Sequence, residues 1–284
     1  MPAVPVAPRV LLPPIRFRRN VDQLTARQLA DFRSAMSQAQ AIGDDRGYLR
    51  HAGIHGLPLP LSCRHGTNLF LPWHRAYLYF FERALRDFVG GIAHPFWDWT
   101  TTPAIPAAYS AELDPDGQPN PLHHGTVDPV ALAQGQNSSP PLNLPAQTFR
   151  QPGRPGTALP PKADIDDTLT INDFFSFSSE LENWHGDVHM WVGGHMQRVP
   201  VAAFDPVFWA HHTQIDRLWR RWQLRHPPPS FTAAFLGTSL PPFPMTVAQT
   251  LDVRALGYDY ATTAVRVPIT PPAPAPASPS AAGS

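Results

Sequence analysis

The fold class is decided by two stretches, LPWHRAYLYFFERALRDFVGG at residues 71–91 and FDPVFWAHHTQIDRLWRRWQL at residues 204–224. Each has a proline near its start and then apolar and aromatic residues at helical spacing, and the first ends at Gly90 and Gly91. Proline suits the first turn of a helix, and glycine suits the position after its last turn. The two stretches therefore predict long helices, the second with Asp205 as its cap.

Two further helices are predicted. Apolar residues recur at helical spacing between Val21 and Ala39, which predicts a helix over 22–41 with Asn20 or Asp22 as its cap. The stretch ELENWHGDVHMWVGG, residues 180–194, predicts another that ends at Gly193 and Gly194. No run of alternating residues indicates a long strand. We expect a mainly α fold, an antiparallel helical bundle with long Pro-rich loops and few short strands.

Composition limits the classes of function. The 284 residues carry 22 basic and 22 acidic side chains, and only 15% are charged, which argues against a nucleic-acid binder. No apolar run is long enough to span a membrane, and prolines interrupt the first residues where a signal peptide needs a continuous apolar stretch. We therefore expect no membrane partner and, by default, a cytoplasmic location. The one cysteine, Cys63, excludes an intramolecular disulfide framework and a multi-thiolate metal site.

Prolines mark the domain boundaries. Of the 36 prolines, 24 lie within residues 1–14, 101–161 and 261–284, while eight Trp and sixteen Phe argue for a packed core. We expect a Pro-rich arm over 1–15, one folded domain over 16–260, and a flexible Pro/Ala-rich tail over 261–284. The tail is either a natural end or the stub of a linker.

Thirteen histidines make an imidazole-bound metal the main hypothesis, because imidazole suits Cu, Zn, Fe and Ni. His185 and His189 are four residues apart on a predicted helix and so share one face, although such a pair fits core packing equally well. Side chains of adjacent helical residues such as His211 and His212 point about 100° apart, so at most one of the two is expected to join His185 and His189 as a metal ligand. The spacing favours His212, with Asp216 one turn away, and places His211 on an apolar stripe.

The first half of the chain offers more histidines. His74 falls in the first turn of a predicted helix, His65 must come from the loop before it, and His55 lies in HGLPLP, where the prolines forbid a helix. Two or three histidines from each half predict two metals facing each other in the bundle core. The remaining histidines receive no metal role: His51, His94, His123, His124 and His226.

The segments HGLP, CRHG, FLPWHRAYL, FWDWT, H-x3-H-x-WVGG, DPVFWAHHTQIDRLW and GYDY occur in this order. Over residues 16–260 the chain resembles the central domain of the tyrosinase, catechol oxidase and molluscan haemocyanin superfamily, proteins with a dinuclear type 3 copper site. The resemblance implies that six histidines hold two copper ions: His55, His65 and His74 on the first, and His185, His189 and His212 on the second. It also implies a thioether between Cys63 and His65. The alternative for Cys63 is a small buried hydrophobe.

The resemblance further implies a polyphenol oxidase, an oxidoreductase that uses O2 through a peroxo-dicopper intermediate. Phenols, o-diphenols or o-aminophenols would be oxidised to o-quinones. Glu182 matches the family's water-holding glutamate, although an acid near a helix end is an equally good reading. Gly186 stands where strong monophenolases have Asn, which shifts the expectation towards o-diphenols and o-aminophenols. Met190, His195 and Val199 are expected at the substrate entrance, with a solvent-facing loop as the alternative for His195.

Two other functions compete with the oxidase. A haemocyanin-like carrier would bind dioxygen through the same ligands without turnover, but the absence of a covering domain after the short tail favours an accessible site. A zinc hydrolase or a structural site predicts neither the Cys63 spacing nor six histidines in two halves. A separate copper-delivery protein is an expected partner, as for some bacterial tyrosinases.

Four predictions concern the scaffold. Arg75 is expected to pair with an acid of the second half, and Tyr258 and Tyr260 to pack near an arginine of RFRRN, residues 16–20. Asp98 and Asp216 are expected to accept imidazole N–H groups, with backbone as the alternative partner for Asp98.

Overall fold

The computed structural model describes residues 14–58 and 62–261, and most of its regular structure is helical. The expected mainly α fold is confirmed. The long helices are α1 (Ala26–Gln40), α3 (Phe70–Phe88), α7 (Phe174–Val192) and α8 (Val207–Arg225). The shorter ones are α2 (Tyr48–His55), α4 (Ala107–Ser110), α5 (Pro129–Gln136), α6 (Lys162–Thr168), α9 (Ala233–Leu236) and α10 (Val247–Thr250), with 3₁₀ turns η1 (Val21–Gln23), η2 (Gly194–Gln197) and η3 (Ala202–Phe204). Most of the predicted arm and tail, residues 1–13 and 262–284, lies outside the described residues.

Local signals set where the helices begin. The start predicted for the first helix is wrong, because Thr25 and Gln28 form a capping box that begins α1 at Ala26. The residues before it form η1, which Asn20 caps. Pro72 lies in the first turn of α3 as predicted, and the Asp205 carboxylate accepts the Val207 N–H at 3.0 Å at the start of α8.

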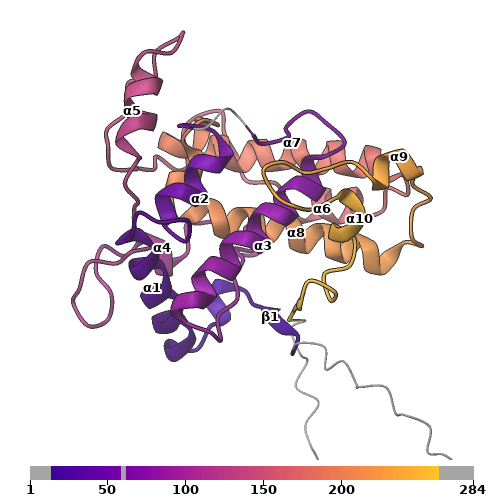
Figure 1. The fold of residues 1–284 in the computed structure, drawn as a ribbon, viewed down its shortest axis with the longest axis horizontal. Coiled ribbons are helices and arrows are strands. Elements are labelled where there is room, and N and C mark those ends of the chain that lie inside the picture. Colours follow the sequence, from indigo (N-terminus) through magenta and orange to yellow (C-terminus); the bar gives the residue numbers. More distant parts are fainter. Residues whose placement is uncertain (1–13, 59–61, 262–284) are drawn as a thin grey trace, which may run out of the picture.

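Three helices enclose the centre of the core. In Figure 1, α7 and α8 run across the molecule and α3 crosses them obliquely, while α5 projects from one end. Helix α3 packs against both α7 and α8. Six tryptophans fill this region with almost no exposed surface: Trp73, Trp97, Trp99, Trp209, Trp219 and Trp222.

A buried charge network joins the two ends of the domain. Strand β1 (Arg16–Arg18) pairs in parallel with β2 (Tyr258–Tyr260), and the Arg18 guanidinium lies 3.7 Å from the centre of the Tyr258 ring. Asp216 on α8 accepts hydrogen bonds from Arg18, Arg75 and both tyrosines. The predicted partners of Arg75 and of the tyrosines are thus confirmed.

The expectation that Asp98 and Asp216 hold imidazoles is wrong. Asp216 is fully engaged by the network, because two guanidiniums and two hydroxyls converge on it. Asp98 accepts from Thr100, Gln214 and Arg217.

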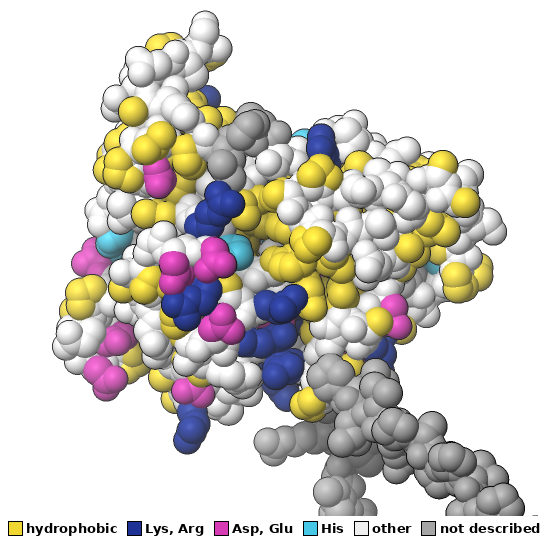
Figure 2. Space-filling view, viewed as in Figure 1, with side chains coloured by type: hydrophobic (Ala, Val, Ile, Leu, Met, Phe, Trp, Pro, Cys, Tyr) yellow, Lys and Arg dark blue, Asp and Glu magenta, His cyan; other side chains and the backbone are white. Residues whose placement is uncertain are grey.

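The surface shows no dominant charge on the face in Figure 2, where basic and acidic side chains lie next to one another with apolar ones between them. Within residues 14–58 and 62–261, no helix is both long enough and apolar enough to cross a bilayer.

Candidate metal centre

The tertiary structure brings together the six predicted histidines from five segments. His74 lies on α3, His185 and His189 lie on α7, and His212 lies on α8. His65 comes from the turn before α3, as predicted. The prediction that His55 lies outside a helix is wrong. His55 is the last residue of helix α2, because the prolines restrict only the residues that follow it.

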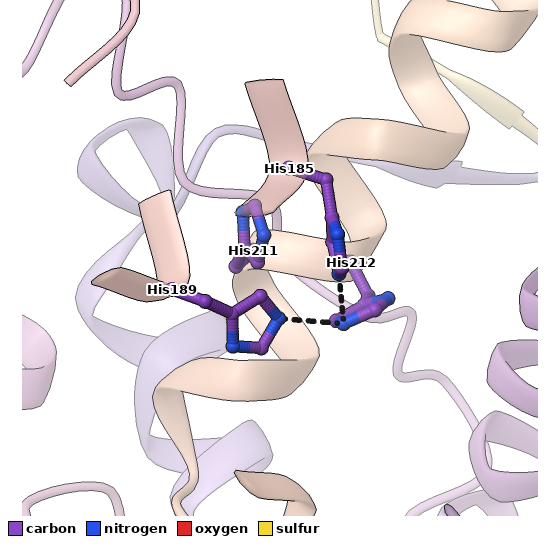
Figure 3. A group of neighbouring side chains, drawn as sticks. All are labelled: His185, His189, His211 and His212. Carbon is purple, nitrogen blue, oxygen red and sulfur yellow. Dashed lines mark hydrogen bonds between the residues drawn. The ribbon is translucent and has the colours of Figure 1, made fainter. Parts of the chain in front are cut away.

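The α7 and α8 histidines form a compact group (Figure 3). The Nε2 atom of His212 lies 3.2 Å from Nε2 of His185 and 3.2 Å from Nε2 of His189. Two nitrogens bound to one metal at roughly 2.0–2.1 Å lie roughly 2.9–3.4 Å apart for angles between square-planar and tetrahedral values. The observed spacing therefore suits three ligands of one metal ion.

The other three histidines form a second group beside it. The ring centroids of His65 and His74 are 5.2 Å apart, and that of His55 lies 5.5 and 5.8 Å from them. Nitrogen atoms of His55, His74 and His212 lie within 4.8 Å of one another, so the two groups share a border. Two metal positions side by side fit this arrangement.

Backbone carbonyls fix which nitrogen faces inward. Nδ1 donates to Phe70 O in His74 at 2.8 Å and to Met196 O in His189 at 2.6 Å, and the Nδ1 of His55 donates to Val199 O at 3.0 Å. Because a carbonyl only accepts, these rings carry their proton on Nδ1, and in the neutral form Nε2 presents a lone pair. The Nε2 atoms of His55 and His74 are buried without a hydrogen-bond partner.

Burial keeps these rings neutral. Desolvation is the main cause that lowers the pKa of His65 and of His189 to about 4, and it lowers that of His212 well below the usual 6.5. Neighbouring imidazoles add to the effect at His212. Neutral imidazoles with unpartnered lone pairs are the state that metal binding requires, so the residues fit a metal pair.

His211 is close to the group, but its tautomer does not suit metal binding. Its Nδ1 accepts the indole N–H of Trp99 at 3.2 Å, so the neutral ring carries its proton on Nε2. Its ring stacks on His185 with a centroid separation of 5.1 Å. The hydrogen bond with Trp99 gives a physical reason to expect His212, and not His211, as a metal ligand. Asp216 is not part of that reason, because it bonds to the arginines and tyrosines of the buried network.

A glycine turn shapes this end of α7. Gly193 and Gly194 have φ of +70° and +57°, and a Cβ on Gly194 would lie 1.9 Å from Phe149 O. Only glycine fits there, and the turn brings the Met196 carbonyl back to His189. The double glycine predicted the helix end, but no sequence signal marks a carbonyl as a ligand's partner.

A cleft of about 570 Å³ opens beside the histidines. It is lined by His55, His65, Gly66, Ser179, Glu182, Asn183, His185, Gly186, Asp187, His189, Met190, Met196, Gln197 and Val199. Of the predicted entrance residues, Met190 and Val199 are exposed at its edge, and a Cβ on Gly186 would meet nothing within 4 Å. The sequence did not indicate the other six lining residues: Gly66, Ser179, Asn183, Asp187, Met196 and Gln197.

His195 does not line this cleft, nor does it face solvent. It is fully buried, accepts the Phe149 N–H through Nδ1 at 3.2 Å, and donates from Nε2 to Pro145 O at 3.0 Å. Both ring nitrogens therefore form hydrogen bonds with loop backbone. The predicted position at the substrate entrance is wrong, and so is the alternative of a solvent-facing loop.

Glu182 connects the two halves of the site. Its Oε1 accepts the Gly66 N–H at 2.6 Å, which ties the turn after His65 to α7 one turn before His185. Burial raises the pKa of the half-buried Glu182 carboxyl, and the Gly66 bond opposes this rise. Cys63 Sγ lies 3.5 Å from His65 Nδ1.

Comparison with known proteins agrees with this geometry. The family profile "Common central domain of tyrosinase" matches residues 45–225. A tyrosinase of Streptomyces lincolnensis is 36% identical over 238 residues, which cover 76% of this chain and 86% of that protein. Units G and H of Sepia officinalis hemocyanin are 31% identical over 72% of this chain, which spans only 37% of that protein.

Solved structures show the same fold. A functional unit of octopus hemocyanin superposes with a TM-score of 0.71 at 28% identity, over 87% of this chain and 68% of that one. Mushroom tyrosinase superposes with a TM-score of 0.71 at 21% identity, over 88% and 91% of the two chains. The chain therefore belongs to the tyrosinase family of type 3 copper proteins.

Proposed function

We propose that the chain is a copper-dependent oxidase of phenols and o-diphenols, with o-aminophenols as a further substrate class and O2 as co-substrate. One copper would be held by His55, His65 and His74, and the other by His185, His189 and His212. The copper pair would supply the activation of O2 and the electron transfer. Two observations support this proposal. The Nε2 atom of His212 lies 3.2 Å from the Nε2 atoms of His185 and His189. On the other side of the ring, the Nδ1 atoms of His55 and His189 donate to backbone carbonyls, which hold these rings in place.

The observation that favours an enzyme over a dioxygen carrier is the cleft. Within the described residues, about 570 Å³ of space connects the surface to His55, His65, His185 and His189. That volume suits a small aromatic molecule. A dioxygen carrier does not need a cleft of this volume, since dioxygen is far smaller than a phenol.

The chain's own residues would bind and orient the substrate. Met190 and Val199 form an apolar edge for the ring, and the absence of a side chain at Gly186 leaves space beside His185. The Glu182 carboxylate, with its raised pKa, would accept the phenolic proton while Gly66 holds it in place. Without a side chain at Gly186 that could help to orient a water, diphenol oxidation is expected to exceed monophenol hydroxylation.

Oxygen consumption by the copper-loaded protein tests this proposal. A monophenol, a catechol and an o-aminophenol are compared with a His212→Gln variant as the control. Turnover of at least one substrate that the control lacks supports an oxidase. Reversible O2 binding without turnover of any of them would assign the chain to the carriers.

The Cys63–His65 thioether has its own test. The 3.5 Å contact between Sγ and Nδ1 places the sulfur beside the His65 ring. The bond would form to Cε1, the carbon next to Nδ1 that carries a hydrogen. Bond formation removes one hydrogen from each residue, and O2 is the oxidant that the proposed activity provides. Intact mass after copper loading is expected to fall by two hydrogen masses, and Cys63→Ser is expected to show no such loss. An unchanged wild-type mass rules the bond out.

A further inference from the structure

A second pair of histidines lies outside the metal centre, on the Pro-rich loop between α4 and α5. The Nδ1 atoms of His123 and His124 are 3.1 Å apart, and both side chains are half-buried. They border a separate cleft of about 610 Å³ whose walls include Phe149 and Trp191. This cleft shares no lining residue with the one beside the metal centre.

The loop holds the two imidazoles in place from both sides. Leu122, just before them, is fully buried and its carbonyl accepts from Arg150 at 3.1 Å. Gly125, just after them, exchanges hydrogen bonds with Thr148, its N–H donating to Oγ1 and its carbonyl accepting the N–H, both at 2.9 Å. A Cβ on Gly125 would lie 2.1 Å from Phe204 O, so the loop backbone packs directly against that of Phe204 and leaves no room for a side chain.

These histidines differ from the others in what their Nδ1 atoms contact. His55, His74 and His189 each donate from Nδ1 to a backbone carbonyl, whereas the Nδ1 atoms of His123 and His124 face each other. The 3.1 Å separation falls within the roughly 2.9–3.4 Å expected for two nitrogens on one ion. On the other side of the ring, His124 Nε2 contacts the side-chain amide of Gln147.

From this geometry we propose that His123 and His124 form an accessory site that chelates one divalent transition-metal ion of the Cu²⁺ or Zn²⁺ class through both Nδ1 atoms. The proton now shared between these atoms moves to Nε2 of His124, where the rotated Gln147 amide accepts it through its oxygen. No net proton is released at neutral pH. Two protein ligands leave further positions open towards the cleft, and Cu²⁺ is the strongest binder of the class at such nitrogens.

The test adds Cu²⁺ to protein whose six central histidines are already loaded with copper. Bound metal after equilibrium dialysis is expected to rise by one equivalent, and the new Cu²⁺ to give a paramagnetic resonance signal split by two nitrogens. His123→Gln and His124→Gln are each expected to lose the additional equivalent. His226→Gln, which alters a half-buried histidine that donates to Leu169 O, is the matched control and is expected to keep it.

Two results would overturn the site. One is that the wild type takes up no additional equivalent. The other is that the His123 and His124 variants bind it like the wild type. Unfolding midpoints and oxidase turnover of the variants are expected to match the wild type, because neither residue lies in the metal centre. Since turnover and the additional equivalent are measured separately, failure of one proposal does not affect the other.

Discussion

Replacing Glu182 by Gln separates two roles of one side chain. The Glu182 oxygen accepts the Gly66 N–H at 2.6 Å, and a glutamine of the same length can accept it through its amide oxygen. An amide cannot take a proton from a phenol. Glu182→Gln therefore keeps the link between the His65 turn and α7 but removes the base, whereas Glu182→Ala removes both.

The two contributions differ in size. A hydrogen bond to a charged group contributes about 1.5–3 kcal/mol and a neutral one about 0.5–1.5 kcal/mol, so Glu182→Gln weakens the link by about 1 kcal/mol. Loss of a general base costs about 10²- to 10⁴-fold in rate, or about 3–5 kcal/mol in the barrier. The rate of monophenol turnover is therefore expected to fall far more than the link to Gly66 alone explains.

Oxygen uptake with a monophenol and with an o-diphenol measures the difference. We expect kcat/KM of Glu182→Gln to fall by about 100-fold or more for the monophenol and by less than about tenfold for the diphenol, which needs no hydroxylation. The wild-type monophenol rate should rise with pH through the raised pKa of Glu182, and the variant should lack this rise. Equal losses on both substrates would refute the assignment, and Glu182→Ala should be the less stable of the two variants.

Three further predictions concern other parts of the molecule. Gly186→Asn fits without steric conflict, since an added Cβ meets nothing within 4 Å, and it is expected to raise the ratio of monophenol to diphenol turnover; an unchanged ratio argues against a role for this position. Asp216→Asn leaves the buried Arg18 and Arg75 without their shared carboxylate and should lower the free energy of unfolding by about 3–5 kcal/mol in urea, against less than about 1 kcal/mol for the more exposed Asp166→Asn. Burial lowers the pKa of His94 to about 3, below the 6.5 of an unfolded histidine, so the unfolded chain binds this proton first and stability falls as pH drops from about 6.5 towards 3. His94→Phe should reduce that slope by up to about 1.4 kcal/mol per pH unit, and an unaltered slope contradicts a buried neutral imidazole.

Much of the fold could be predicted from local signals. Pro72 and the double glycines at 90–91 and 193–194 mark helix ends through backbone geometry, which does not depend on distant residues. The helix predicted from residue 22 begins instead at Ala26, because Thr25 and Gln28 cap it better than Asn20 or Asp22. The spacing of His185 and His189 likewise puts two ligands on one helix face, since side chains four residues apart in a helix point the same way.

The partners of the histidines could not be predicted in the same way. The sequence suggested Asp98 and Asp216 as imidazole acceptors, but the carbonyls of Phe70, Met196 and Val199 fill that role. A carbonyl has no sequence signature, and its position depends on how the chain turns. The prediction for His195 is wrong for the same reason, since its partners are backbone groups of a loop about fifty residues away.

The sequence by itself determined the helical class, the family and the six candidate ligands, because helix periodicity and motif order are properties of the chain. Tertiary structure alone decided which nitrogen of the rings faces inward, what holds the Nδ1 atom of His211, and where the cleft opens. These depend on contacts between segments far apart in sequence, such as Trp99 with His211 and Gly66 with Glu182. The proton on an imidazole follows its hydrogen-bond partner, and only the folded chain supplies that partner.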